Sequence, residues 1–177
     1  MKKGSTYLVL IVFLVLLFVQ YSYGQYGNLK GGASAQIGVG FTEVGILATG
    51  GFSKNFTQEI SGVFNVSYNG AEVSDINYHA IYLDGIASYL AYTVGQGRFN
   101  LSTQGGISFV GDFRNDFAND VSDSRFSMNY GFMGGVEIEI AALKSFGILM
   151  IGNARYYIKE DYGKFRYQFL TGIRYAF

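Results

Sequence analysis

The sequence lacks three residue types altogether: it contains no cysteine, no proline and no tryptophan. Without cysteine the chain cannot form a disulfide scaffold, a cysteine-ligated zinc site, a cysteine nucleophile or a lipid-modified N-terminal cysteine. Proline is the residue that cannot donate a backbone hydrogen bond to a strand ladder, so its absence suits a chain that is mostly β-sheet.

Charge is also scarce. Charged residues make up 15% of the 177 residues, with 13 Lys and Arg against 13 Asp and Glu, whereas an average globular chain carries about 25%. The basic residues form no block, and binding to nucleic acid depends on many phosphate contacts. We therefore expect no direct nucleic-acid binding.

Glycine and aromatic residues are abundant instead, with 25 Gly, 15 Tyr and 16 Phe. A chain that is rich in glycine and aromatics, poor in charge and free of proline is better suited to a closed β-sheet than to a helical bundle.

The first 24 residues have the three parts of a secretory signal. Lys2 and Lys3 give a positive start, the run from Tyr7 to Val19 is entirely apolar, and the small residues Ser22 and Gly24 favour cleavage before Gln25. The alternative is a transmembrane anchor, but a spanning helix needs about 20 apolar residues, and this run is shorter. The sequence thus predicts a signal peptide over 1–24 and a single exported domain over 25–177.

The exported part alternates with a period of two, which is the pattern of a half-buried β-strand. The C-terminal stretch is the clearest example. Its odd positions are mainly aromatic and aliphatic, and its even positions are polar or small. The odd set is Phe165, Tyr167, Phe169, Thr171, Ile173, Tyr175 and Phe177, and the even set is Arg166, Gln168, Leu170, Gly172, Arg174 and Ala176.

The same test predicts eight strands, several of them longer than the roughly five or six residues of an ordinary strand. Ile76–Tyr92 alternates least well, and a bulge near Asp84–Gly85 is one explanation. The other predicted strands are Ala33–Phe41, Val44–Ser53, Phe56–Tyr68, Phe99–Asp112, Arg125–Ile140, Ile148–Lys159 and Phe165–Phe177.

The predicted connections alternate between two kinds. Tight turns fall at Lys54–Asn55, Thr93–Arg98 and Ala141–Gly147. The connections at the other end carry most of the free charge. They are Gly70–Asp75, Phe113–Ser124, Glu160–Lys164 and the short Phe41–Glu43. Short periplasmic turns and longer outer loops are typical of outer-membrane barrels. A sheet that crosses hydrocarbon must close so that no edge is left unpaired.

We therefore predict an all-β fold: an eight-stranded antiparallel transmembrane β-barrel in the outer membrane, with the lipid bilayer around it. The alternative is a secreted soluble barrel with a ligand cavity, which would place apolar residues inside and polar residues outside. Here one face carries most of the aromatics and the other carries the charges, which favours lipid on the outside.

An eight-stranded barrel has a lumen that side chains fill. The inward phase supplies acids and bases that can pair across it, either as a structural plug or as a proton or ion path, and we favour the plug. This predicted network comprises Glu59, Asp84, Glu137, Glu139, Arg155, Arg166 and Arg174, with Lys159 as a further base.

Residues for catalysis are few. His79 is the only histidine, and no acid lies at a telling spacing from it, although a triad is defined by geometry rather than by sequence. The acids of Phe113–Ser124 lack the glycine and closing glutamate of a calcium-binding EF-hand loop. We predict no catalytic site, cofactor or metal, and keep a hydrolase that uses His79 as a minor alternative.

The end of the chain resembles two known patterns. Alternating aromatics that end in Tyr175 and Phe177 resemble the signal read by the outer-membrane assembly machinery. The last third also resembles the TraO proteins of Bacteroidetes conjugative transposons. That likeness is carried by Gly134-Gly135-Val136-Glu137-Ile138-Glu139, by Asn153-Ala154-Arg155, and by Phe165 with Gln168-Phe169-Leu170-Thr171-Gly172-Ile173.

Looser likeness upstream extends the TraO resemblance over most of the exported chain. It implies a non-enzymatic outer-membrane component of a conjugative DNA-transfer apparatus, working beside other transfer proteins. The alternative function is that of a general outer-membrane barrel, an adhesin or envelope-stability protein, with no part in conjugation.

Overall fold

The structure is a computed structural model, and it describes residues 31–177 except 74–75, 96, 117–122, 144 and 160–163. The predicted signal peptide, residues 1–24, lies outside the described residues and stays a prediction. Among the residues that are described, no helix has the length and apolarity needed to span a bilayer.

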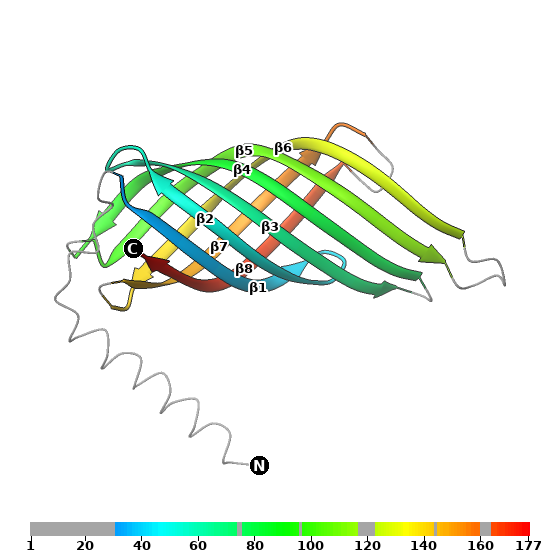
Figure 1. Ribbon diagram of the computed structural model, residues 1–177, viewed down its shortest axis with the longest axis horizontal. Coiled ribbons are helices and arrows are strands. Elements are labelled where there is room, and N and C mark those ends of the chain that lie inside the picture. Colours follow the sequence, from blue (N-terminus) through cyan, green and yellow to red (C-terminus); the bar gives the residue numbers. More distant parts are fainter. Residues whose placement is uncertain (1–30, 74–75, 96, 117–122, 144, 160–163) are drawn as a thin grey trace, which may run out of the picture.

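Eight strands form one closed barrel in which each strand pairs with its sequence neighbours and β1 pairs with β8 (Figure 1). Every pairing is antiparallel. This confirms the predicted fold class. The strands are β1 Ala33–Thr42, β2 Ile46–Asn55, β3 Ile60–Val73, β4 Ile76–Val94, β5 Phe99–Asp116, β6 Asp123–Ala141, β7 Phe146–Tyr157 and β8 Phe165–Ala176.

The turn between β2 and β3 lies further along the chain than predicted. We expected a strand from Phe56, but β3 begins at Ile60. The hydroxyl of Thr57 accepts hydrogen bonds from the backbone N–H groups of Glu59 and Ile60, at 3.1 and 2.8 Å. Such a local side-chain bond favours a turn over a continued strand.

The bulge predicted at Asp84–Gly85 is not there. Asp84 pairs regularly with Ser108 and Gly85 with Ile107, and the register between β4 and β5 shifts instead between Leu90 and Tyr92. The weak alternation of β4 has a different cause, since its inward face carries the apolar Ala80, Tyr82 and Ile86 beside Asp84. Both faces of this strand are therefore largely apolar.

The orientation of the side chains agrees with the membrane prediction. Phe169 is 55% exposed on the outer surface, whereas Arg166 is only 5% exposed and points inward. Ring pairs at both ends of the barrel, such as Tyr156–Phe165 and Phe146–Tyr175, form aromatic girdles on that surface. A soluble barrel would have the opposite arrangement, so the alternative of a secreted barrel with a ligand cavity is set aside.

The start of β1 and the end of β8 lie on the same side of the barrel as the turns 56–59, 95–98 and 142–145 (Figure 1). We refer to this end as the turn side, and to the other as the loop side. Short turns and termini face the periplasm in outer-membrane barrels, so the loop side is the extracellular side.

Candidate functional site

The interior of the barrel holds most of the predicted charges, together with Asp112, in two groups at different heights. We name Asp84, Arg155, Asp112 and Arg166 the loop-side layer, and Glu137, Glu139 and Arg174 the turn-side layer. These groups are brought together by strand closure, because their members come from strands far apart in the sequence.

The first pair of the loop-side layer joins β7 to β4. Arg155 Nη2 lies 2.6 Å from Asp84 Oδ2, and Arg155 Nε donates to Asp84 Oδ1 at 3.4 Å. Both side chains are only 1% exposed. Arg155 Nη1 also donates to the side-chain oxygen of Gln168 on β8, so its guanidinium is held from two sides.

The second pair of this layer joins β8 to β5. Arg166 binds both carboxylate oxygens of Asp112, at 2.9 and 2.8 Å, in the two-point geometry that arginine and carboxylate favour. The hydroxyl of Tyr78 donates to the same carboxylate and accepts from Arg166.

We did not predict Asp112 or Tyr78 as part of the interior network. Asp112 was the last residue of the predicted strand Phe99–Asp112, and its phase already placed it on the inward face.

Arg155 and Arg166 lie directly opposite each other on β7 and β8, where two like charges repel. Aromatic rings help to offset this repulsion. The Arg155 guanidinium carbon lies 4.7 Å from the centre of the Tyr82 ring, and that of Arg166 lies 5.1 Å from the centre of the Tyr157 ring. With one carboxylate for each arginine, the layer is electrically balanced.

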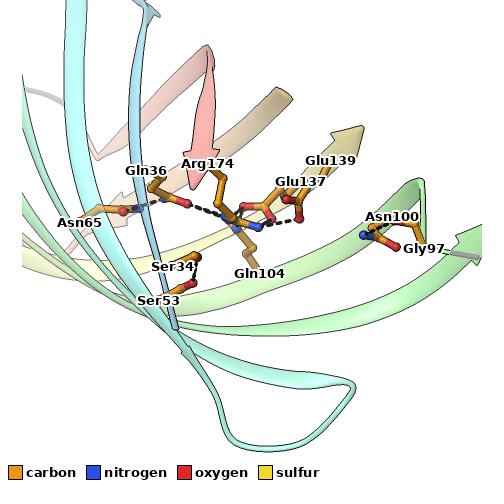
Figure 2. Close-up of polar contacts among 10 residues, drawn as sticks. All are labelled: Ser34, Gln36, Ser53, Asn65, Gly97, Asn100, Gln104, Glu137, Glu139 and Arg174. Atoms are coloured by element: carbon orange, nitrogen blue, oxygen red, sulfur yellow. Dashed lines mark hydrogen bonds and ion pairs between the residues drawn. The ribbon is translucent and has the colours of Figure 1, made fainter. Parts of the chain in front are cut away.

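The turn-side layer is centred on Arg174 of β8 (Figure 2). Its guanidinium binds both oxygens of Glu137, at 2.8 and 2.9 Å, and one oxygen of Glu139, at 2.8 Å. It also donates to the side-chain oxygen of Gln36 at 2.7 Å. Gln36 in turn donates to Asn65 at 2.9 Å. Strands β1, β3, β6 and β8 are therefore joined through one arginine.

Apolar side chains share the lumen with these polar layers. Leu47, Leu149 and Ile151 are buried in the lumen, with Tyr82 and Tyr157 in the same cluster. The arrangement has the features of a plug that ties the barrel wall together, which is the alternative we favoured from the sequence.

Glu59 does not belong to this network, and its inclusion was wrong. It lies in the exposed turn between β2 and β3. Lys159 likewise lies exposed beyond the end of β7. In both cases we extended the alternation of a strand into a segment where the chain had already left the sheet.

His79 lies on the outer surface, away from both layers. Its Nδ1 is 2.6 Å from the hydroxyl of Tyr68, and the two rings stack. Its cross-strand partners are Gly70 and Phe113, and neither supplies a nucleophile. Among the residues that the structure describes, no three His, Cys, Asp or Glu side chains gather as a ligand set for a metal ion.

The C-terminal residues of the predicted assembly signal lie on the lipid-facing surface. The rings of Tyr175 and Phe177 are 6.2 Å apart, and Phe177 also lies 6.2 Å from Phe52 of β2. Recognition by the assembly machinery stays a prediction, because it takes place before the barrel closes.

No protein-family model and no curated protein matches the chain. Several solved structures match its fold. The N-terminal β-barrel domain of Pseudomonas aeruginosa OprF is 12% identical, with a TM-score of 0.65, over 84% of this chain and 98% of that one. A major outer membrane protein from Thermus thermophilus is 10% identical, with a TM-score of 0.67, over 83% of this chain and 99% of that one.

Ail, the attachment invasion locus protein of Yersinia pestis, is 12% identical, with a TM-score of 0.59, over 84% of this chain and all of that one. At such identities the likeness shows the fold alone. The chain has the fold of an eight-stranded outer-membrane barrel, and its closed sheet with an apolar outer belt locates it in the outer membrane.

Proposed function

We propose that this barrel is a non-enzymatic outer-membrane component of a conjugative transposon DNA-transfer apparatus. The observation that carries the proposal is the resemblance of its last third to TraO proteins. In the barrel, the three segments with that resemblance lie on the adjacent strands β6, β7 and β8. They include Glu137, Glu139 and Arg155.

The position of these segments gives the resemblance a structural meaning. They supply one continuous part of the wall together with three of the seven charges of the two ion-pair layers. Three of the shared residues therefore take part in ion pairs that join strands across the lumen. A closed barrel has no passage for DNA, so the role we propose is that of an anchor for other transfer proteins.

A non-enzymatic role is supported by the surroundings of His79, the residue on which a hydrolase would depend. Its ring is hydrogen-bonded to Tyr68, and its cross-strand partners are Gly70 and Phe113. One structural neighbour, the outer membrane enzyme PagL, is 16% identical with a TM-score of 0.51. Barrels of this shape are therefore compatible with catalysis, but the side chains around His79 do not favour it.

Deletion of the gene from a donor strain tests the proposal directly. We expect the frequency of transposon transfer to fall, and to return when the full-length gene is supplied in trans. A matched control is His79→Ala, which leaves both ion-pair layers intact and should restore transfer as well as the natural gene does. If the frequency of transposon transfer is unchanged in the deletion strain, the proposal is refuted.

The second candidate is a general surface barrel such as an adhesin. Ail, an attachment protein by its name, shares the fold, and strands β4, β5 and β6 are longer than β7 and β8. In that case the deletion strain would transfer the transposon normally but lose adherence to surfaces or cells.

A further inference from the structure

The apolar outer surface of the barrel is not of even height. Strands β4, β5 and β6 have 19, 18 and 19 residues, whereas β1 and β2 have 10 each. Figure 1 shows β4, β5 and β6 continuing past the ends of β1 and β2. On the turn side, β4 ends at Val94, β5 begins at Phe99 and β6 ends at Ala141, so the extra length lies on the loop side.

The apolar surface is short on β1 and β2, and charged side chains mark its limits. On β1 it runs from Ala33 to Phe41, and the exposed Glu43 follows in the turn to β2. The exposed Lys54 lies near the turn-side end of β2. With a rise of about 3.4 Å per residue and a strand tilt of about 40°, Ala33–Phe41 covers a height of about 20 Å, close to the roughly 25 Å apolar band of outer-membrane barrels.

The apolar surface on β5 and β6 is much taller. Along β6 the outward positions contain no charged residue from one end to the other. They are Ile140, Ile138, Val136, Gly134, Phe132, Tyr130, Met128 and Phe126. The same rise and tilt give this surface a height of about 35 Å. On β5 the outward positions reach from Phe99 to Phe113, and the rings of Phe113 and Phe126 are 4.8 Å apart.

The top of the tall surface is apolar and exposed. Phe113, Phe126 and Met128, which we name the upper patch, are 42%, 58% and 62% exposed. A flat slab of hydrocarbon that fits β1 would leave the upper patch above it, among headgroups and water. The side chains that suit the headgroup level are Tyr and Trp, which combine an apolar ring with a polar group. Phe and Met have no such group, so the upper patch requires apolar surroundings.

We propose that acyl chains of the extracellular leaflet cover the upper patch, and that the barrel thereby imposes a step in the thickness of the outer membrane. The chains rise along β5 and β6 and stay low along β1 and β2. A bilayer adapts to a tall apolar surface by local thickening and to a short one by thinning. Long acyl chains are therefore favoured beside β5 and β6. This inference does not depend on a role in conjugation.

Tilting of the whole barrel does not remove the mismatch. In a closed barrel of eight strands, β5 and β6 lie opposite β1 and β2. A tilt lowers one side and raises the other, but it leaves the apolar surface taller on one side than on the other. The bilayer itself must therefore adapt.

Continuity with the lipid-facing surface identifies lipid as the occupant. Below the upper patch, the outward side chains Tyr130 and Phe132 are 50% and 62% exposed, as on the rest of the lipid-facing surface. A protein partner or a second copy of the chain would cover the upper patch alone, and no charged side chain on the outward positions of β6 separates the patch from the surface below it.

Single tryptophan reporters test the position of the lipid, since the chain has no tryptophan of its own. The reporters are Phe126→Trp in the upper patch, Phe41→Trp at the top of the short side and Glu72→Trp at an exposed charged position of β3. Each is refolded in phosphatidylcholine vesicles and quenched either with lipids brominated on the acyl chain or with aqueous iodide. If Phe126→Trp does not fold, Met128→Trp takes its place.

We expect bromolipid to quench Phe126→Trp as strongly as Phe41→Trp, and iodide to quench only Glu72→Trp strongly. Weaker quenching of Phe126→Trp by bromolipid than of Phe41→Trp would overturn the proposal. In that case, strong quenching by iodide would indicate a flat bilayer with the upper patch in water. Weak quenching by both agents would indicate that protein covers the patch, and a dependence on the lipid-to-protein ratio would identify a second copy of the chain.

A second measurement tests the step in thickness. Dibromostearoyl phosphatidylcholine is added as a minor component to short-chain dimyristoyl vesicles and to long-chain dioleoyl vesicles. In the short-chain host, the long brominated chains should be enriched roughly twofold around Phe126→Trp but not around Phe41→Trp. Equal enrichment at the two reporters, or none at either, would show that the bilayer has the same thickness on both sides and would overturn the proposal.

Discussion

Removing the carboxylate of Asp84 should destabilise the barrel severely. The substitution Asp84→Ala leaves Arg155 with Gln168 and the Tyr82 ring as partners, and with Arg166 directly opposite it. Arg155 is 1% exposed, so water cannot replace the lost carboxylate. An uncompensated buried charge of this kind costs about 3–5 kcal/mol, which lowers the folding equilibrium constant roughly 10²- to 10⁴-fold.

The double variant Asp84→Ala/Arg155→Met separates the charge effect from the loss of packing. When both charges are removed, no ion is left buried and a flexible apolar side chain fills the space, so much of the lost stability should return. We therefore expect the double variant to be more stable than Asp84→Ala alone.

The assay is urea unfolding of the refolded barrel in lipid vesicles, followed by the heat-dependent mobility shift on SDS gels or by circular dichroism, since the chain has no tryptophan. Glu59→Ala is the matched control. It removes one carboxylate from an exposed turn and should change the free energy of unfolding by less than about 0.5 kcal/mol.

One result would refute this reasoning. If Asp84→Ala is as harmless as Glu59→Ala, the lumen around Arg155 is hydrated and its charges are screened. The interior would then be a water-filled path and not a plug, and conductance across a planar bilayer should be measurable for the natural protein.

Three further predictions concern other parts of the barrel. Ile37 is 63% exposed near the middle of β1, so Ile37→Arg should cost about 2–4 kcal/mol in vesicles, and Ile37→Ala far less in the same unfolding assay. A Cβ at Gly131 would lie 1.9 Å from a backbone oxygen, whereas one at Gly105 meets nothing within 4 Å. Gly131→Ala should therefore cost roughly 1–3 kcal/mol, and a Gly105→Ala variant that is equally unstable would contradict this. Phe177→Ala should reduce the amount of folded barrel in the outer membrane of cells but not the yield of refolding in pure lipid. Equal losses in both settings would assign Phe177 to stability and not to recognition by the assembly machinery.

The two ion-pair layers mark the limit of what alternation predicts. The phase of β8 placed Arg166 and Arg174 in the lumen correctly, because a period of two assigns every residue of a strand to one face. It does not state which acid each arginine meets. That depends on register and closure, which bring Asp112 of β5 to Arg166 and Glu137 of β6 to Arg174.

The errors have two physical origins. Glu59 and Lys159 follow the alternation of a strand, but β3 begins only at Ile60, after the turn that Thr57 stabilises, and β7 has ended at Tyr157. The bulge at Asp84–Gly85 was inferred from the poor alternation of Ile76–Tyr92, which arises because the apolar Tyr82 and Ile86 pack inside the lumen. A small lumen must be filled as well as neutralised, so apolar residues belong on both faces.

The sequence by itself determined that this chain forms a closed β-sheet with an aromatic exterior and charges inside. Composition and the two-residue period are local properties, and hydrocarbon permits such strands only in a closed sheet. Only the tertiary structure decided the pairs Asp84–Arg155 and Asp112–Arg166 and the hydrogen bond from the Asn129 side chain to Lys159. These features depend on where neighbouring strands end relative to one another, which is set by register around the whole barrel.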